Sequence, residues 1–172
     1  MPLEILKYNH PALRKRATPI TEITSDIVTL SQNMLETMYH NNGIGLAGNQ
    51  VGVLKMIIII DIGARESAPD PHIFINPSIV QTEGRGEYEE GCLSIPGLHE
   101  LILRPEKIII EAQNLKGQAL RLEAEGLLAR VIQHEIDHLQ GVLFIDKLSP
   151  IKRHLLKSQL KKIDKEYNLY RD

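Results

Sequence analysis

Two histidines and a glutamate at helical spacing carry the clearest chemistry in this sequence. The segment His134-Glu135-Ile136-Asp137-His138 places its two imidazoles four residues apart. On an α-helix both then lie on one face and can bind one metal ion. Glu135 lies next to that face and could take a proton from water held by the metal. The pattern therefore predicts a hydrolytic metal site on a helix.

The surrounding segment indicates a buried helix, which makes two histidines on an exposed helix the weaker interpretation. Residues 123–140 have a helical pattern that ends at Gly141. Unpaired polar side chains inside a protein are costly, and a metal ion is a partner that satisfies the imidazoles and Glu135 together. The apolar side chains spread over more than one face of the helix, at Leu127, Leu128, Val131, Ile132, Ile136 and Leu139.

The single cysteine of the chain offers a third metal ligand. Cys92 lies in the segment EGCLS, residues 90–94, and cannot form an intramolecular disulfide, which is typical of a reducing compartment. A lone cysteine is more often a small buried side chain. Catalytic metal sites, however, typically have three protein ligands and an open fourth position, and Cys92, His134 and His138 make such a set.

A third segment with unusual composition lies upstream. Residues 43–50 have the sequence GIGLAGNQ, and small residues let another group approach the backbone closely. The segment lacks the Gly-Lys-Ser/Thr end of a phosphate-binding loop. A turn that ends a helix is the alternative interpretation.

Together these three segments carry a resemblance to a known family. GIGLAGNQ, EGCLS and QHEIDH, in this order and with these separations, resemble the three motifs of bacterial and organellar peptide deformylases. The likeness runs from the early Pro-Ala-Leu-Arg segment through residues 141–144. It implies an α+β fold, with antiparallel β-sheets around a central buried metal-binding helix. It also implies hydrolysis of the N-formyl group from the N-terminal formyl-methionine of nascent polypeptides, with release of formate.

The resemblance also implies roles for individual residues and a choice of metal. In this family the ligand set goes with Fe²⁺ as the physiological metal, while Zn²⁺, Ni²⁺ or Co²⁺ can occupy it. Ligand softness alone allows iron or zinc. The implied residues are Cys92, His134 and His138 as metal ligands, Glu135 as the general acid/base, and the Gln50 side-chain amide and the Leu93 backbone N–H as donors to the oxyanion.

The expected substrate is an extended peptide whose methionine side chain enters an apolar pocket. Strand-like backbone at residues 43–46 and 89–91 could pair with the peptide by β-augmentation. Two positions depart from the family pattern: Gly48 stands where alanine is usual, and His99 lies near a position where some relatives carry arginine. The expected substrate-binding residues are Ile44, Gly45, Gly91, Leu127 and Val131.

Length and composition are typical of one globular domain. The chain has 172 residues, 42% of them hydrophobic, which suffices for a real core. A formal net charge of −2 gives no reason to expect DNA binding, and no apolar run approaches the ~20 residues that span a bilayer. The N-terminus lacks the pattern of a secretory signal. We expect a cytoplasmic bacterial protein.

Periodicity predicts the elements that must position these residues. A helix is expected over residues 25–41 and a buried strand over residues 56–62. Gly84-Arg85-Gly86 reads as a turn between two strands, and residues 114–117 as the turn of a hairpin. The further expected strands cover residues 72–76, 78–83, 86–90, 107–112 and 119–122.

We expect a catalytic domain over residues 1–148 and, packed on it, a C-terminal helix over residues 149–172. Ser149-Pro150 is a favourable start for a helix, and an apolar stripe at Leu155, Leu156, Leu160 and Ile163 favours packing on the domain. The other side is basic and could meet ribosomal RNA phosphates, so the ribosome is a candidate partner. The basic residues are Lys152, Arg153, Lys157, Lys161, Lys162 and Lys165.

Three other functions stay open at this point. A His-Glu-x-x-His metallopeptidase would share the helix and the glutamate but typically takes its third ligand from a downstream residue. A structural metal module needs a fourth ligand, such as His72 or His99. A ribosome- or protein-binding module without catalysis would rest on the basic helix. Release of formate from a formyl-methionine peptide distinguishes deformylation from all three.

Overall fold

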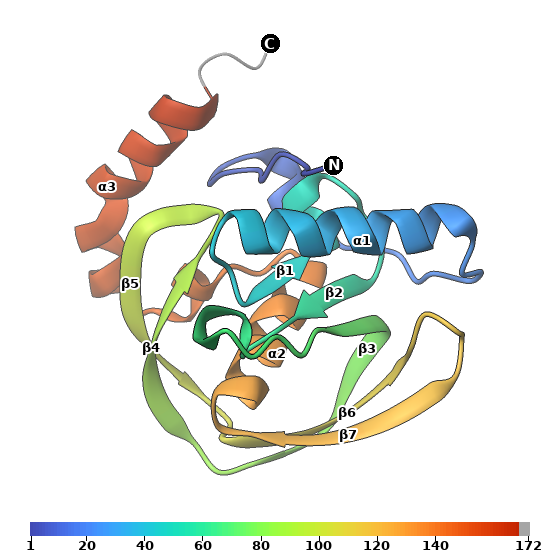
Figure 1. Cartoon of the computed structure of the whole chain (residues 1–172). Helices are drawn as coiled ribbons and strands as arrows, with labels where there is room; N and C mark the ends of the chain where they lie inside the picture. The colour runs from blue at the N-terminus through green and yellow to red at the C-terminus, as the bar shows by residue number, and fades with distance from the viewer. Residues whose placement is uncertain (169–172) are drawn as a thin grey trace.

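The computed structural model describes residues 1–168, in which helices, strands and short 3-10 helices alternate. The 3-10 helices are Pro11–Arg14, Gly48–Val51, Ala64–Glu66 and Phe144–Lys147. The α-helices and β-strands (Figure 1) are α1 (Ser25–His40), β1 (Gly45–Ala47), β2 (Ile57–Ile60), β3 (His72–Glu83), β4 (Gly86–Cys92), β5 (Ile95–Arg104), β6 (Lys107–Gln113), β7 (Ala119–Glu125), α2 (Gly126–Leu139) and α3 (Pro150–Asn168).

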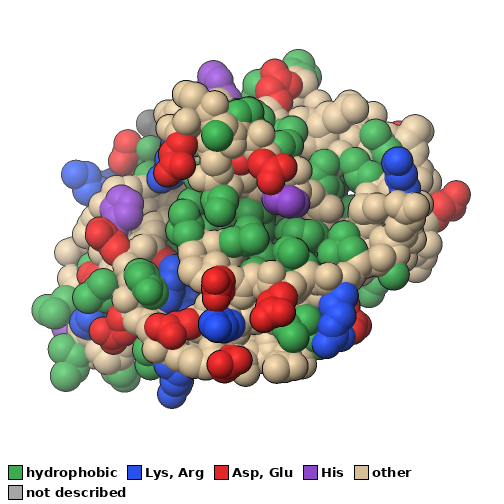
Figure 2. Space-filling model, turned by 60° about the horizontal axis from the view of Figure 1, so that its bottom comes forward, with side chains coloured by type: hydrophobic (Ala, Val, Ile, Leu, Met, Phe, Trp, Pro, Cys, Tyr) green, Lys and Arg blue, Asp and Glu red, His purple; other side chains and the backbone are tan. Residues whose placement is uncertain are grey.

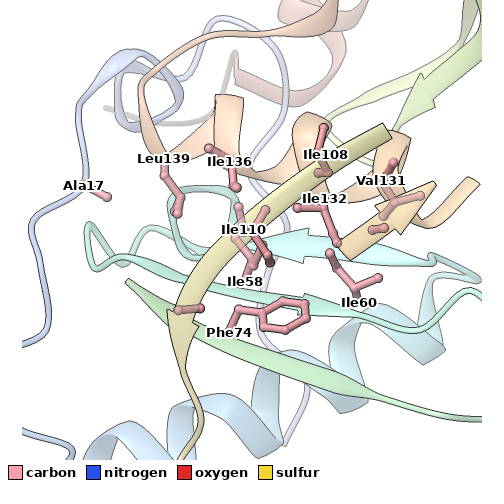
Figure 3. Packing of buried hydrophobic residues seen from close by; sticks show 14 residues of the cluster. Ala17, Ile58, Ile60, Phe74, Ile108, Ile110, Val131, Ile132, Ile136 and Leu139 are labelled. Atoms are coloured by element: carbon pink, nitrogen blue, oxygen red, sulfur yellow. The ribbon is translucent and has the colours of Figure 1, made fainter. Parts of the chain in front are cut away.

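The strands form two antiparallel sheets, with α1 and α2 packed on the larger one. Five strands lie in the order β1-β2-β3-β6-β7, and β4 pairs with β5 in a separate two-stranded sheet. Ile57 and Ile59 of β2 join a buried cluster with residues of α1, whereas Ile58 and Ile60 join a second cluster with Ile132 and its neighbours on α2 (Figure 3). Because alternate strand residues point to opposite faces, the run of isoleucines is buried on both sides. The predicted α+β fold is confirmed.

Helix α2 is central and buried, as expected, but it begins later than predicted. Residues 123–125, expected as helix, belong to β7, where Ala124 pairs with Ile108 of β6. The C-terminal end of α2 lies where the sequence predicted it. Gly141 has φ 75° and its N–H donates to His138 O, while the Val142 N–H donates to Asp137 O, both at 3.0 Å. This is a Schellman ending, which glycine favours.

Strand β3 is one long strand where two short ones were predicted. The register against β6 shifts between Ile75 and Ser78, and this irregularity accommodates Pro77, which cannot donate to the ladder. Asn76 has φ 51°, and its side chain accepts a hydrogen bond from Ile20 N–H and donates one to Ile20 O, each at 2.8 Å. The break that Pro77 predicts is therefore a register irregularity within one strand, and the Asn76 side chain binds the backbone of Ile20 beside it.

The two strands expected around Gly84-Arg85-Gly86 are present, but they belong to different sheets. β3 pairs with β6, and β4 pairs with β5, so residues 84 and 85 connect the two sheets. The ten-residue strand β5 was not predicted. Pro96 and Gly97 interrupt its beginning, and apolar residues on both faces hide its alternation.

Helix α3 packs mainly through its second half. Leu160 and Ile163 are buried in a cluster with Ile95 of β5 and with Phe144, and Leu156 of the first half is partly buried against the same cluster. Leu155 of the predicted apolar stripe, however, is 72% exposed. The Lys152 N–H donates to Ser149 Oγ at 3.3 Å, a cap at the start of the helix. The last four residues of the expected helix, 169–172, lie outside the described residues. Within residues 1–168, no helix has the length and apolarity needed to cross a bilayer.

Candidate metal centre and cleft

The three predicted ligands come from β4 and α2, and their side chains lie close together. Cys92 ends β4, while His134 and His138 lie one turn apart on α2. Their ligand atoms all lie within 4.8 Å of one another. Cys92 Sγ is 3.3 Å from His138 Nε2, which is itself 3.3 Å from His134 Nε2. A sulfur and two imidazole nitrogens at these separations fit a single divalent cation.

The candidate metal site has three ligands in the described part of the chain, whereas a structural metal module would need a fourth. No fourth His, Cys, Asp or Glu among residues 1–168 joins the cluster. His72 instead lies 3.2 Å from Asp70, and the ring of His99 covers the Cα of Gly91, where an added Cβ would meet it at 2.6 Å. The arrangement therefore leaves room for an open position.

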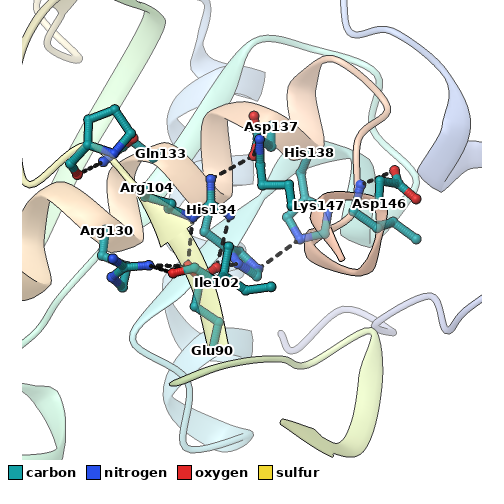
Figure 4. A network of polar contacts seen from close by, with 12 residues as sticks. Glu90, Ile102, Arg104, Arg130, Gln133, His134, Asp137, His138, Asp146 and Lys147 are labelled. Atoms are coloured by element: carbon teal, nitrogen blue, oxygen red, sulfur yellow. Dashed lines mark hydrogen bonds and ion pairs between the residues drawn. The ribbon is translucent and has the colours of Figure 1, made fainter. Parts of the chain in front are cut away.

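A buried carboxylate orients His134 (Figure 4). Glu90 accepts hydrogen bonds from His134 Nδ1 at 3.0 Å, from Arg104 Nε at 2.6 Å and from Arg130 Nη1 at 2.7 Å. Burial raises the pKa of Glu90, but His134 and Arg104 outweigh it and lower the pKa to about 2. With Nδ1 held, Nε2 of His134 faces the cluster, the orientation that metal-binding histidines usually receive from such a partner. Sequence reasoning missed Glu90, although it stands in the EGCLS segment, and no sequence signal pointed to Arg104 or Arg130.

The electrostatics of the cluster favour a positive charge at this place. Burial lowers the pKa of His134, but hydrogen bonds to Cys92 and Glu90 outweigh it and raise the pKa to about 10. The sulfur and the Glu90 carboxylate thus stabilise positive charge at His134, whereas burial and the charge of His134 lower the pKa of His138.

Glu135 lies beside the cluster in a nearly closed environment. The side chain is 4% exposed, and its Oε2 has no hydrogen-bond partner among the described residues. Burial raises the pKa of Glu135 to about 7, the range in which a carboxylate can both accept and return a proton. A Cβ at Gly45 would lie 2.5 Å from Glu135 Oε1, so the glycine of β1 lets the carboxylate pack against the strand.

Gln50 is held with its amide nitrogen towards the Cys92 turn. Ala47 N–H donates to Gln50 Oε1 at 2.9 Å, and Gln50 Nε2 donates to Ser94 Oγ at 3.2 Å and lies 3.5 Å from Cys92 Sγ. Sequence reasoning missed the hydroxyl of Ser94. The departure at Gly48 has a local reason, because a Cβ there would lie 2.7 Å from Val53 O.

A cleft of about 790 Å³ opens beside the cluster. Leu127 is 53% exposed, so the first turn of α2 lies at its mouth and is not buried as the sequence suggested. Figure 2 shows hydrophobic side chains gathered in the middle of one face, with charged side chains around them. Sequence reasoning missed Lys7, Arg65 and His99 in the lining. The predicted residues that line the cleft are Ile44, Gly45, Gln50, Gly91, Cys92, Leu93, Leu127, Val131, His134 and Glu135.

Comparison with known proteins agrees with this geometry. The family model described as polypeptide deformylase matches residues 2–154. A peptide deformylase of Thermodesulfovibrio yellowstonii is 49% identical, over 92% of this chain and 96% of the relative. A crystal structure of a peptide deformylase from Legionella pneumophila superposes with a TM-score of 0.90 and 38% identity, covering 100% of this chain and 99% of the other. A peptide deformylase from Synechococcus elongatus in complex with actinonin gives a TM-score of 0.85 and 38% identity, covering 96% and 87%.

Proposed function

Because the chain belongs to the polypeptide deformylase family, we propose that Cys92, His134 and His138 hold its metal ion and that Glu135 moves the proton in its reaction. The family's enzymes are metal-dependent hydrolases of protein biosynthesis, which remove the N-formyl group from nascent polypeptides. The observation that carries the residue assignment is the cluster of three ligand atoms within 4.8 Å next to a buried carboxylate oxygen without a partner. A His-Glu-x-x-His peptidase is not favoured, since the third candidate ligand is a cysteine from upstream.

The proposed mechanism is hydrolysis of a formamide. A divalent cation at the cluster would polarise water and supply positive charge. The Glu135 carboxylate accepts a proton from the attacking water, whose oxygen bonds to the formyl carbon. Gln50 Nε2 and the Leu93 N–H donate to the oxygen on which negative charge develops. The carbon–nitrogen bond then breaks, Glu135 returns the proton to the departing amine, and formate leaves.

The substrate is proposed to lie in the cleft as an extended strand. Residues 43–45 and 89–91 line the cleft, and the backbone of residues 43–46 and 89–91 is proposed to hydrogen-bond a peptide by β-augmentation. Ile44, Leu127 and Val131 form the apolar wall for the methionine side chain. A pocket of this kind separates side chains by about 1–3 kcal/mol per methylene, so formyl-Met-Ala-Ser should give a clearly higher kcat/KM than formyl-Gly-Ala-Ser.

Two variants test the residue assignment. Cys92→Ala should lose bound metal and formate release together, whereas Glu135→Gln should keep the metal and lose about 10²-fold or more in kcat. Metal content by elemental analysis and formate release from formyl-Met-Ala-Ser are the two measurements. Full metal occupancy with normal turnover in Cys92→Ala would contradict the ligand set.

The metal is proposed to be Fe²⁺, with Zn²⁺, Ni²⁺ or Co²⁺ able to occupy the same ligands. One thiolate and two imidazoles suit each of these ions, so the donor set alone does not choose. The metal content of protein purified without oxygen, measured beside deformylase activity, tests the proposal. Zinc in fully active, anaerobically purified protein would overturn it.

We also propose that the enzyme acts in the cytoplasm, where nascent chains begin, and that α3 helps to place it at the ribosome. In this proposal residues 1–148 form the catalytic domain, and residues 149–172 are the C-terminal segment that packs on it. Lys157, Lys161 and Lys162 are exposed on α3 and could neutralise RNA phosphates. Co-sedimentation with bacterial ribosomes should fall steeply with salt and should be lost when these three lysines are changed to glutamate. Equal sedimentation of parent and variant would leave α3 a purely structural helix.

A further inference from the structure

Lys7 reaches the turn after Cys92 from the opposite end of the chain. Its Nζ donates a hydrogen bond to Leu93 O at 2.9 Å, and the side chain lines the cleft together with Cys92 and Leu93. Burial outweighs the charges of Cys92 and Glu4 and lowers the pKa of Lys7. The Lys7 side chain contacts the backbone of the residue whose N–H is the proposed oxyanion donor.

Lys7 belongs to a segment that bridges two of the functional motifs. The Leu6 N–H donates to Gln50 O, and the Tyr8 N–H donates to Ser94 O, both at 2.8 Å. Residues 6–8, the N-terminal strap, thus fix the backbone of Gln50 relative to that of the Cys92 turn. The distance between the two proposed oxyanion donors depends on this bridge, because they come from motifs far apart in the sequence.

The last turn of α3 contacts the N-terminal strap through two side chains. Asn168 Nδ2 donates to Tyr8 O at 2.6 Å, and the Tyr167 ring lies 5.5 Å from Lys7 Nζ. A cation over an aromatic face is favoured. Tyr167 therefore contacts the Lys7 ammonium beside Leu93, and Asn168 holds the backbone of the next residue, Tyr8.

We propose that Lys7 is a positioning residue of the deformylase reaction, which holds the Leu93 carbonyl and thereby limits the motion of the turn that carries the Leu93 N–H. The two groups belong to consecutive peptide planes that are joined at the Leu93 Cα, so the bond from Lys7 fixes the second plane and leaves the turn less freedom to move. The ammonium also keeps positive charge beside the place where negative charge develops, and donors that are already oriented need no reorganisation during the reaction. The proposal rests on the oxyanion role assigned to Leu93 above.

The test compares Lys7→Gln with Lys7→Arg, because glutamine keeps a donor but no charge and arginine keeps both. The control is Lys107→Gln, a half-exposed lysine that pairs with Glu125 on the hairpin β6–β7. We expect kcat with formyl-Met-Ala-Ser to fall about 10-fold in Lys7→Gln, the scale for residues that orient a metal site, with KM changed by less than about twofold. Lys7→Arg and Lys107→Gln should retain kcat.

A second measurement does not depend on turnover. In Co²⁺-loaded protein, a cation near the sulfur lowers the energy of its lone pairs. The sulfur-to-cobalt charge-transfer band should therefore move to longer wavelength in Lys7→Gln and return in Lys7→Arg. The band of Lys107→Gln should match that of the parent.

Equal kcat values in the Gln and Arg variants, whether both normal or both low, would overturn the proposal. So would a lower melting temperature in Lys7→Gln with an unchanged band and unchanged kcat, which is the result of a purely structural contact. If the parent protein binds metal and releases formate while these outcomes are seen, only the role of Lys7 fails and the proposed function stands.

Discussion

Glu90 shows at the residue scale how one buried side chain sets the orientation of His134, a proposed metal ligand. It is 6% exposed and accepts hydrogen bonds from His134, Arg104 and Arg130. Arg104 Nη1 also donates to Asp137 Oδ2 at 2.8 Å, and Lys147 Nζ lies 3.4 Å from that Asp137 oxygen. A buried ion pair adds little net stability while it is intact, but removal of one partner leaves an uncompensated charge.

Glu90→Gln is therefore expected to affect both stability and metal binding. The free energy of unfolding should fall by about 3 kcal/mol, because the buried Arg130 loses its counter-charge and Arg104 keeps only its pair with Asp137. Metal affinity should fall about 10- to 100-fold, because His134 loses the acceptor that orients it. Urea unfolding and competition with a chelator are the measurements. Glu87→Gln, exposed on the same strand, is the control; parent-like metal affinity in Glu90→Gln would contradict the orienting role.

At the scale of elements, a single hydrogen bond joins the end of α1 to the end of β2. The Tyr39 hydroxyl donates to Asp61 Oδ2 at 2.6 Å. Burial raises the pKa of Asp61, but hydrogen bonds from Tyr39, Asp70 and Gly63 outweigh it and lower the pKa. Burial and the bond to Asp61 raise the pKa of Tyr39 to about 12. The pair is thus most stable with Asp61 ionised and Tyr39 neutral.

This pair predicts two pH windows of stability. Asp61, with a lowered folded pKa, contributes stability above the ordinary value of 3.8 and loses it as the pH falls below that value. Tyr39, with a raised folded pKa, contributes below pH 10 and loses the contribution as the pH rises towards about 12. Tyr39→Phe should make the free energy of unfolding less dependent on pH in both windows. Tyr88→Phe, at a ring that lies under the Arg130 guanidinium, should leave the profile unchanged, and an identical profile in Tyr39→Phe would refute the assignment.

Helix α3 offers a matched pair of leucines for a test of its packing. Leu160 is 7% exposed and Leu155 is 72% exposed. Leu160→Ala should lower the free energy of unfolding by about 2–5 kcal/mol, because it leaves a cavity in the cluster shared with β5. Leu155→Ala should change it by less than about 0.5 kcal/mol. Equal effects in urea unfolding would mean that α3 is not docked as described.

For the whole molecule, the proposed metal site would link the two sheets. Cys92 belongs to the two-stranded sheet, while His134 and His138 lie on α2, which packs against the five-stranded one. A ligand that binds only the folded chain stabilises it, by about 2.7 kcal/mol at 100 times its Kd. Removal of the metal with a chelator should therefore lower the melting temperature, and added metal should restore it. Cys92→Ala should show no such response; a response equal to that of the parent would place the metal elsewhere.

The sequence by itself determined the features that depend on neighbouring residues. The i, i+4 spacing of His134 and His138 puts both on one helix face, because backbone geometry fixes the helical period. The glycine that ends α2 and the isoleucine run of β2 were predictable for the same reason. The cleft-lining position of Val131 was predictable in the same way, since Val131 lies three residues before His134 on the same helix face.

Only the tertiary structure decided which distant segments meet. The grouping of Cys92 with the two histidines was expected, but the bond of Glu90 to His134 and the contact of Lys7 with Leu93 were not, and each joins residues far apart in the chain. Such contacts depend on strand pairing and on the register of packed elements, and the local pattern does not encode them. For the same reason β3 and β4, which follow each other directly in the sequence, belong to different sheets.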